Sequence, residues 1–154
     1  MEVFSSGIIN GKILDKYGKR SISQRFGMPT ISLPIEIKNA PKNTACFTII
    51  FDDPDSVNVC GYIWIHWLVA NLTTTSLEEN ASETNFNIIQ GKNSWNDNSY
   101  GGPCPPDRPH RYRLRVFALN SLLNLRGDFT LEQLEKEMDG KIIDKAEIFG
   151  IYDN

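Results

Sequence analysis

The stretch HRYRLRVFAL (residues 110–119) decides the fold, because its side chains alternate between two chemical classes. One class is mostly apolar and consists of His110, Tyr112, Leu114, Val116 and Ala118. The other class begins with Arg111, Arg113 and Arg115. An apolar–polar alternation with a period of two is typical of a β-strand that turns one face to the core. The phase therefore predicts that His110 and Tyr112 lie on the core side.

Two further stretches of strand type precede this one. ACFTIIFD (45–52) is rich in β-branched and aromatic residues and is bounded by PKN and DDPD, which favour turns. GYIWIHWLVANL (61–72) is apolar on both alternating faces, which predicts a central strand that is covered on both sides. A closing strand is expected at DKAEIFGIY (144–152).

One helix is expected after residue 130. Thr130 and Gln133 form a capping box, and Phe129 can pack onto Leu134 as a hydrophobic staple. Gly140 is expected to end the helix. By contrast, residues 1–44 suggest turns and short strands, and residues 73–109 form a long polar connection without obvious structure.

The fold class expected from these elements is mainly β. The elements favour a β-sandwich around a large central sheet, with one or two peripheral helices. A chain of 154 residues suits a single domain, taken here as residues 1–154.

Composition narrows the classes of function. The net charge of −3 argues against a general nucleic-acid-binding protein, which would usually be basic. No apolar run approaches the roughly 20 residues of a membrane span, and the N-terminal segment lacks the pattern of a secretory signal. A cytoplasmic protein without integral membrane association is therefore expected. The three cysteines (Cys46, Cys60 and Cys104) show no CxxC spacing, which favours reduced thiols.

Asp53 is the first candidate for chemistry. It follows in phase after Phe47, Ile49 and Phe51, so a carboxylate at the end of an apolar face can border a pocket. The alternative is purely local, since Asp-Pro-Asp sequences commonly end strands in a turn.

The only two histidines, His66 and His110, both fall in expected strands. Either could be a core histidine with a satisfied hydrogen bond. Together with Asp53, however, they suggest an anion site, because imidazole N–H groups donate hydrogen bonds to oxygen anions. Asp53 would orient an imidazole and favour its protonated form. The backbone N–H groups of Gly101 and Gly102 are expected to converge on the same anion.

Other combinations leave alternatives open. His66, His110, Asp53 and Cys104 have the chemistry of metal ligands, but no short ligand pair marks a site, so no metal or other cofactor is expected. A nucleophilic arrangement of Cys104 and His110 with an aspartate would make the protein a hydrolase. Cys104 lies between two prolines instead of at a helix N-terminus, which would help to lower a thiol pKa. The arginine row (Arg111, Arg113 and Arg115) suggests a solvated face, or a surface for a protein partner or a homodimer.

Three separated motifs carry a resemblance to a known family. DPDS (53–56), WIHW (64–67) and GGPCPP…HRY (101–112) occur in the order found in the phosphatidylethanolamine-binding protein family. The ending FGIY (149–152) looks like its bacterial Raf-kinase-inhibitor-like branch. The resemblance runs from about residue 20 to the end of the chain.

The resemblance implies a β-sandwich with a small pocket for anions such as phosphate or a phospholipid head group. By motif, the implied ligand-binding residues are Asp53, Asp55, Trp64, His66, Gly102, Pro103, His110 and Tyr112. Two positions depart from the family pattern: Val57 stands where proline is frequent, and Arg108 stands where glycine is common. Arg108 would bring an extra positive charge to the loop.

The function expected is therefore binding, not catalysis. The ligand would be a small phosphate- or carboxylate-bearing molecule or a phosphorylated group on a protein, and the resemblance implies a regulatory role. The alternatives are a hydrolase that uses His110 or Cys104, and a protein-interaction module that uses the arginine row.

Overall fold

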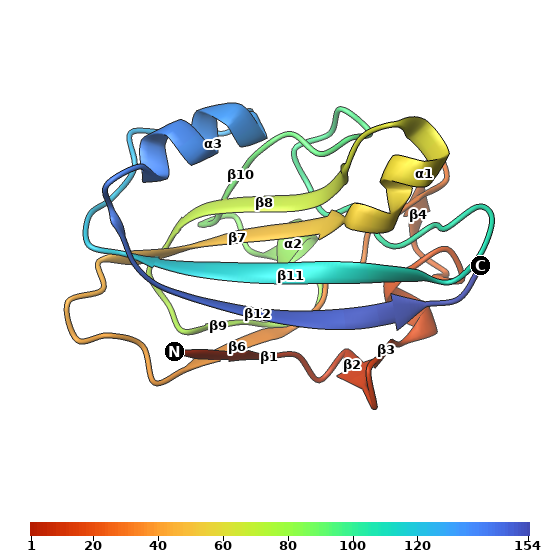
Figure 1. Cartoon of the computed structure of the whole chain (residues 1–154), viewed down its shortest axis with the longest axis horizontal. Helices are drawn as coiled ribbons and strands as arrows, with labels where there is room; N and C mark the ends of the chain where they lie inside the picture. Colours follow the sequence, from red (N-terminus) through yellow and green to blue (C-terminus); the bar gives the residue numbers. More distant parts are fainter.

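A seven-stranded mixed sheet forms the centre of the molecule in the computed structural model, which describes residues 1–154 (Figure 1). Four long antiparallel strands make up most of it. In spatial order the sheet consists of β10 (Ile89–Gln90), β8 (Trp64–Leu72), β7 (Cys46–Asp53), β11 (His110–Leu119), β12 (Ile142–Tyr152), β3 (Lys12–Ile13) and β2 (Ile8–Ile9). The mainly β fold class is confirmed.

The remaining elements are short. A three-stranded sheet consists of β1 (Glu2–Phe4), β6 (Ile35–Lys38) and β9 (Ser76–Leu77), and a hairpin consists of β4 (Gln24–Arg25) and β5 (Met28–Pro29). The helical elements are η1 (Asp15–Tyr17), η2 (Pro54–Ser56), α1 (Val57–Cys60), α2 (Ala81–Thr84) and α3 (Leu131–Met138). No helix has the length and apolar composition needed to cross a membrane.

Both faces of the large sheet are covered, each by a different layer. On one face, side chains of β1, β6 and β9 join those of β7, β8 and β11 in a core cluster of 20 buried residues. On the other face, Phe129, Leu134 and Met138 pack with residues of the same three long strands in a cluster of 11. The small sheet packed on the large one is the expected sandwich, and α3 covers the other face as a peripheral helix.

The strand phases explain which side chains reach the core. His110 and Tyr112 are both 1% exposed and lie on the core face of β11, as the alternation predicts. β8 is covered on both sides, also as predicted. Its lateral position differs from the prediction, because only the two-residue strand β10 lies beyond it in the sheet. Its apolar faces reflect the layers above and below, not its place within the sheet.

The signals for α3 are confirmed in detail. The Thr130 hydroxyl accepts a hydrogen bond from the Gln133 backbone at 3.2 Å, and the Gln133 side chain accepts one from the Thr130 backbone at 2.9 Å. Gly140 follows with φ +72°, the left-handed conformation that favours glycine after a helix.

The long segment 73–109 has more structure than its polar sequence suggests. It contains β9, α2 and β10, and side-chain hydrogen bonds organise the rest. The side-chain amide oxygen of Asn93 accepts hydrogen bonds from the backbone N–H groups of Trp95 and Asp97, and the Tyr100 N–H donates to the Ser82 hydroxyl. The segment ends beside the last residues of β7, where the candidate site lies.

Candidate functional site

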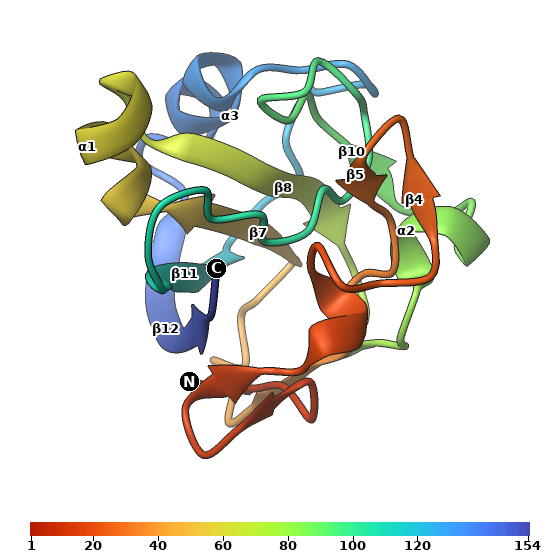
Figure 2. The same cartoon turned by 90° about the vertical axis from the view of Figure 1, so that its right-hand side faces the viewer.

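A cavity of about 270 Å³ opens at the end of the large sheet where β7 ends and β8 and β11 begin. Figure 2 views this end, with α1 and the loop before β11 beside the strands. The lining residues are Asp53, Ser56, Val59, Cys60, Trp64, His66, Trp95, Cys104, Pro106, His110 and Tyr112. Five of the eight predicted residues are among them: Asp53, Trp64, His66, His110 and Tyr112.

Asp53 satisfies both interpretations drawn from the sequence. Its Oδ1 accepts a hydrogen bond from the Asp55 backbone N–H at 3.0 Å, so it caps the turn η2, in which Pro54 takes the first position. Its Oδ2 lies 2.7 Å from Nδ1 of His110. The carboxylate is nearly buried, and the turn therefore fixes it in place beneath the histidine.

His110 lies between two carboxylates. Nδ1 faces Asp53 at 2.7 Å and Nε2 faces Oδ1 of Asp107 at 2.8 Å. Because an ionised carboxylate only accepts hydrogen bonds, both ring nitrogens must donate, and only the imidazolium has two N–H groups. Burial by itself would lower the pKa of His110, but the hydrogen bonds to the two carboxylates outweigh it and raise the pKa. The geometry and the raised pKa therefore both favour the protonated form of this buried ring.

His66 has the opposite character. Its Nδ1 lies 2.5 Å from the carbonyl oxygen of Gly101, which can only accept, so Nδ1 carries the proton. Burial lowers the pKa of His66 to about 4, although the Gly101 carbonyl favours the charged form. At neutral pH the ring is therefore neutral, and Nε2 is an acceptor. Its position is held by aromatic contacts with Phe51, Trp95 and Tyr112.

Two polar groups of the lining have no hydrogen-bond partner. They are the Tyr112 hydroxyl and the indole N–H of Trp64, and both atoms are buried. Burial raises the pKa of Tyr112 well above its ordinary value, so the hydroxyl keeps its proton. A buried donor without an acceptor costs free energy, and native proteins contain few of them. Both groups would be satisfied by a ligand that brings acceptor oxygens into the cavity.

The comparison with known protein families agrees with the fold and with the motifs around the cavity. The family model described as phosphatidylethanolamine-binding protein matches residues 4–153, which is nearly the whole chain. The chain belongs to the phosphatidylethanolamine-binding protein family.

Individual relatives support this membership. YxkA of Bacillus subtilis is 37% identical over 155 residues, covering 90% of this chain and 92% of YxkA. The crystal structure of a phosphatidylethanolamine-binding protein homologue from Chlamydia trachomatis superposes with a TM-score of 0.86 at 34% identity, over 99% of this chain and 97% of the homologue. YbcL of Escherichia coli shares the fold, with a TM-score of 0.84 at 24% identity over 99% of this chain and 98% of YbcL.

Two residues of the family's Gly-Pro motif lie outside the lining. The Gly102 N–H donates to the Pro29 carbonyl at 2.9 Å, and the Gly101 N–H donates to the His66 carbonyl at 2.8 Å. The expectation that these N–H groups converge on an anion is therefore wrong, because backbone carbonyls occupy both. A Cβ atom at Gly102 would collide with the Tyr17 carbonyl, so close backbone packing explains the glycine. Pro103 accepts the Lys19 N–H at 2.8 Å, and any contact of this motif with a ligand stays a prediction.

Asp55, the second acid of the family's Asp-Pro-Asp motif, lies behind the cavity. Its carboxylate accepts the Arg111 backbone N–H at 2.8 Å and lies 3.4 Å from the Arg108 guanidinium. These contacts lower the pKa of Asp55, the Arg111 hydrogen bond most strongly. Asp55 therefore ties the start of β11 to the turn after β7.

Several residues at the cavity escaped the sequence interpretation because they lie on loops and short helices. They are Ser56, Val59, Cys60, Trp95, Pro106 and Asp107. Strand phase carries no information about such positions. The glycine- and proline-rich loop and the resemblance both pointed to the region around Pro106, but neither singled out these residues.

The same geometry bears on two alternatives drawn from the sequence, a hydrolase and a metal site. Burial raises the pKa of Cys104 to about 11, so its sulfur is a thiol at neutral pH. Both nitrogens of His110 are bonded to carboxylates and none is free to take a proton from a nucleophile. No three His, Cys, Asp or Glu side chains are grouped so that they could hold a metal ion.

The arginine row is only partly solvated. Arg113 donates two hydrogen bonds to Asp52 at 3.0 and 2.9 Å, and Arg115 lies 2.5 Å from the same carboxylate. Arg111 stacks 3.7 Å from the ring centre of Phe149. The row neutralises a buried aspartate of β7, so it is not a free basic surface.

Proposed function

We propose that this member of the phosphatidylethanolamine-binding protein family binds a small phosphate-bearing ligand in the cavity lined by Asp53, His66, His110 and Tyr112. Family membership supports a ligand-binding or regulatory role. The observation that carries the finer proposal is the pair of unpaired donors at the cavity, the Tyr112 hydroxyl and the Trp64 indole N–H, beside the protonated ring of His110.

The chemistry of these donors favours an oxyanion. Phosphate oxygens accept several hydrogen bonds at once, and bonds to charged groups are about twice as strong as neutral ones. A carboxylate-bearing ligand would use the same donors with fewer oxygens. The Nε2 lone pair of neutral His66 adds an acceptor, which suits a phosphate that retains one proton. A cavity of about 270 Å³ suits a small group, not an extended molecule.

Calorimetric titration with inorganic phosphate and with phosphoethanolamine tests the proposal, and co-sedimentation with phosphatidylethanolamine vesicles separates a lipid head group from a soluble ligand. The wild type is expected to bind at least one phosphate probe. The Trp64→Phe/Tyr112→Phe double variant should bind it at least about tenfold more weakly, because two donors are lost.

Tyr62→Phe is the matched control, since Tyr62 is exposed and stacks on Trp64 without lining the cavity. It should bind as the wild type does. Equal binding by the wild type and the double variant, or no binding of any phosphate probe by the wild type, would contradict the proposed function.

A further inference from the structure

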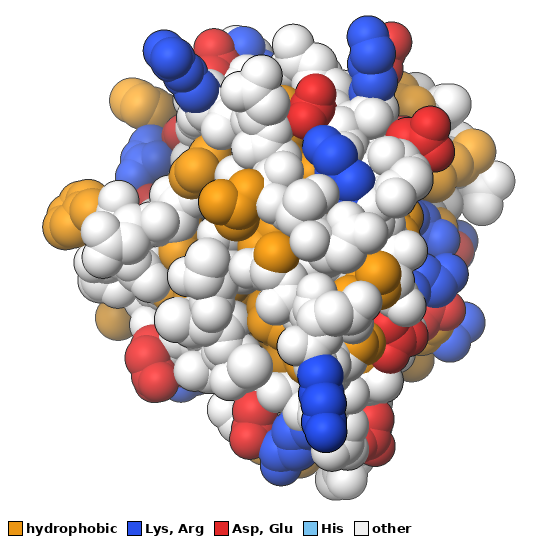
Figure 3. Space-filling model, turned by 90° about the vertical axis from the view of Figure 1, so that its left-hand side faces the viewer, with side chains coloured by type: hydrophobic (Ala, Val, Ile, Leu, Met, Phe, Trp, Pro, Cys, Tyr) orange, Lys and Arg blue, Asp and Glu red, His pale blue; other side chains and the backbone are white.

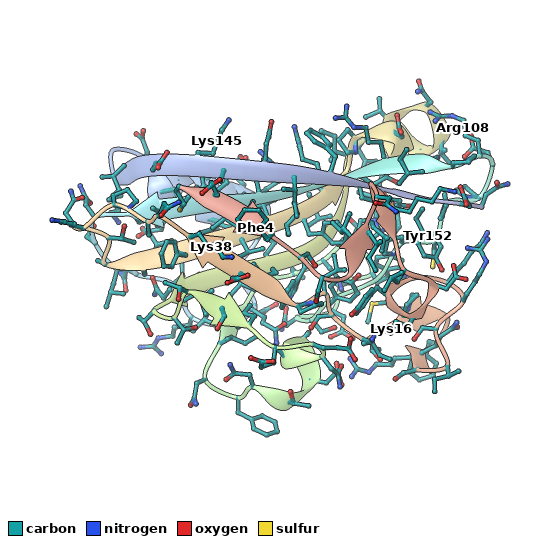
Figure 4. All side chains as sticks on the ribbon, turned by 90° about the horizontal axis from the view of Figure 1, so that it is seen from below. Phe4, Lys16, Lys38, Arg108, Lys145 and Tyr152 are labelled. Carbon is teal, nitrogen blue, oxygen red and sulfur yellow. The ribbon has the colours of Figure 1, made fainter.

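Asp107 occupies a position on His110 that a ligand of the cavity would need. Its Oδ1 lies 2.8 Å from Nε2 of His110, and Pro106 beside it lines the cavity. The Asp107 side chain is 48% exposed, whereas that of His110 is 1% exposed. The carboxylate therefore reaches a buried ring from the loop at the cavity mouth. Figure 4 labels the neighbouring Arg108 at the same end of the molecule as Tyr152.

The two carboxylates that face His110 are held very differently. Asp53 has a nearly buried side chain, and its second oxygen is fixed by the Asp55 backbone. The other partners of the Asp107 carboxylate are on its own exposed loop: Arg108 Nε at 3.9 Å and the backbone of Asp107 and Arg108. Asp53 is thus a permanent part of the site, while Asp107 can turn into solvent without disturbing the core.

Charge makes this difference important for an anion. With Asp53, Asp107 and His110 ionised and His66 neutral, the groups around the cavity sum to one negative charge. Without Asp107 they sum to zero. An incoming anion therefore meets repulsion and an occupied donor as long as Asp107 stays on Nε2.

We propose that Asp107 is a built-in competitor for the anion: its carboxylate takes the place of a phosphate oxygen on Nε2 of His110, and the ligand binds by displacing it. The proposal rests on the proposed function, since it concerns the same cavity. Carboxylate and phosphate oxygens make the same kind of charge-assisted hydrogen bond to an imidazolium, so one can replace the other. The displaced carboxylate stays beside the Arg108 guanidinium, which limits the cost of its release. Asp107 thereby lowers the apparent affinity of the cavity for anions.

The test compares the binding of inorganic phosphate to the wild type, Asp107→Ala and Asp107→Asn by calorimetry. Asp107→Ala is expected to bind phosphate up to about fivefold more tightly than the wild type, because the competing ion pair is lost. Asp107→Asn should lie between the two, since its amide oxygen can still accept from Nε2. Glu135→Ala is the control for a simple change of net charge, because Glu135 is exposed on α3 and makes no ion pair. Figure 3 shows the end of the molecule opposite the cavity, where charged and apolar side chains are interspersed.

A second measurement uses the wild type itself. The hydrogen bond to His110 is the main reason that the pKa of Asp107 is lowered. Saturating phosphate should return the Asp107 carboxyl towards its ordinary titration, as followed by its ¹³C NMR signal. The proposal that Asp107 competes with the anion would be contradicted if Asp107→Ala bound phosphate equally or more weakly than the wild type. It would also be contradicted if phosphate left the Asp107 titration unchanged. Either result would leave the proposed function intact. If none of the variants binds phosphate, both proposals fall.

Discussion

Two histidines line the cavity, and their surroundings favour opposite charge states. We call the side of the cavity formed by His66 the acceptor wall and the side formed by His110 the cationic wall. On β8, His66 is enclosed by aromatic rings, and its single polar partner is the Gly101 carbonyl. On β11, His110 has carboxylates at both ring nitrogens. The first environment keeps the ring neutral and the second keeps it charged.

This contrast shows that the identity of a residue does not decide its role in binding. A neutral ring with its proton on Nδ1 offers an acceptor to the cavity, and a charged ring offers positive potential and donors. Between the rings stands Tyr112, whose ring centre is 5.1 Å from that of His66 and 6.3 Å from that of His110. The cavity thus combines an acceptor wall, a cationic wall and a shared hydroxyl donor.

The largest effect is expected when the cationic wall loses its fixed carboxylate. Asp53→Ala leaves a buried imidazolium without its Nδ1 acceptor and removes the cap of η2. Breaking a buried ion pair by deleting one partner typically costs about 3 kcal/mol of unfolding free energy. Urea denaturation near neutral pH measures this loss. Asp107→Ala is the matched control and should be much milder, because the Asp107 carboxylate is half exposed. Equal losses would mean that the two carboxylates are not held differently.

Because the pKa of His66 is lowered in the fold, the protein is expected to lose unfolding free energy in acid. The pKa of folded His66 is about 4, below the ordinary value of 6.5 expected in the unfolded chain. Its contribution is therefore complete above the unfolded pKa and is lost as pH falls towards the folded pKa. Relative to His66→Gln, the wild type should lose about 2.5 kcal/mol between neutral pH and pH ~4.5. Urea denaturation of both proteins at several pH values checks this difference, which cancels the titration of the carboxylates. A difference that stays constant would mean that folding leaves the pKa of His66 at its ordinary value.

Most of the fold could be predicted because period and capping are local signals. The alternation from His110 to Ala118 and the capping box at Thr130 depend on a few neighbouring residues, and both appear in the structure. The lateral order of strands is not local. The two-residue strand β10 pairs beside β8, and nothing in the polar sequence around Ile89 indicates such a short strand.

Residues of the candidate site could be predicted where the alternation of a strand shows which side chains face inward. Asp53, His110 and Tyr112 stand at strand positions whose facing direction follows from counting, and all three line the cavity. His66 lines it too, but its strand is apolar on both faces, so phase alone did not assign its side. Asp107 could not be found in this way, because a loop side chain is directed by tertiary contacts. The Gly101 and Gly102 N–H groups were assigned wrongly for a related reason: their acceptors, His66 and Pro29, are remote in sequence.

A smaller effect on unfolding free energy is expected from the hydroxyl groups of two buried tyrosines, Tyr100 and Tyr112. The Tyr100 hydroxyl donates to the Tyr17 carbonyl at 2.9 Å, whereas that of Tyr112 has no partner. Tyr100→Phe should therefore cost about 1 kcal/mol of unfolding free energy, and Tyr112→Phe should cost less or slightly stabilise the protein. Thermal or urea denaturation compares them. A larger loss for Tyr112→Phe would show that its hydroxyl has a structural partner and is not reserved for a ligand.

The smallest effect concerns the charge of His110 during binding. Sulfate is a suitable probe, because it keeps the same charge across the range in which histidine titrates, while phosphate does not. The pKa of His110 is raised, so the positive charge is fully present below the ordinary histidine value of 6.5 and is lost as pH rises through the folded pKa. Sulfate affinity should be highest below the ordinary histidine value and should fall as pH rises through the raised pKa of His110. His66 has the opposite shift and would make affinity fall steeply already between about pH 4 and pH 6. Titration of sulfate by NMR at a series of pH values therefore identifies which of the two walls supplies the charge, and an affinity independent of pH would mean that neither does.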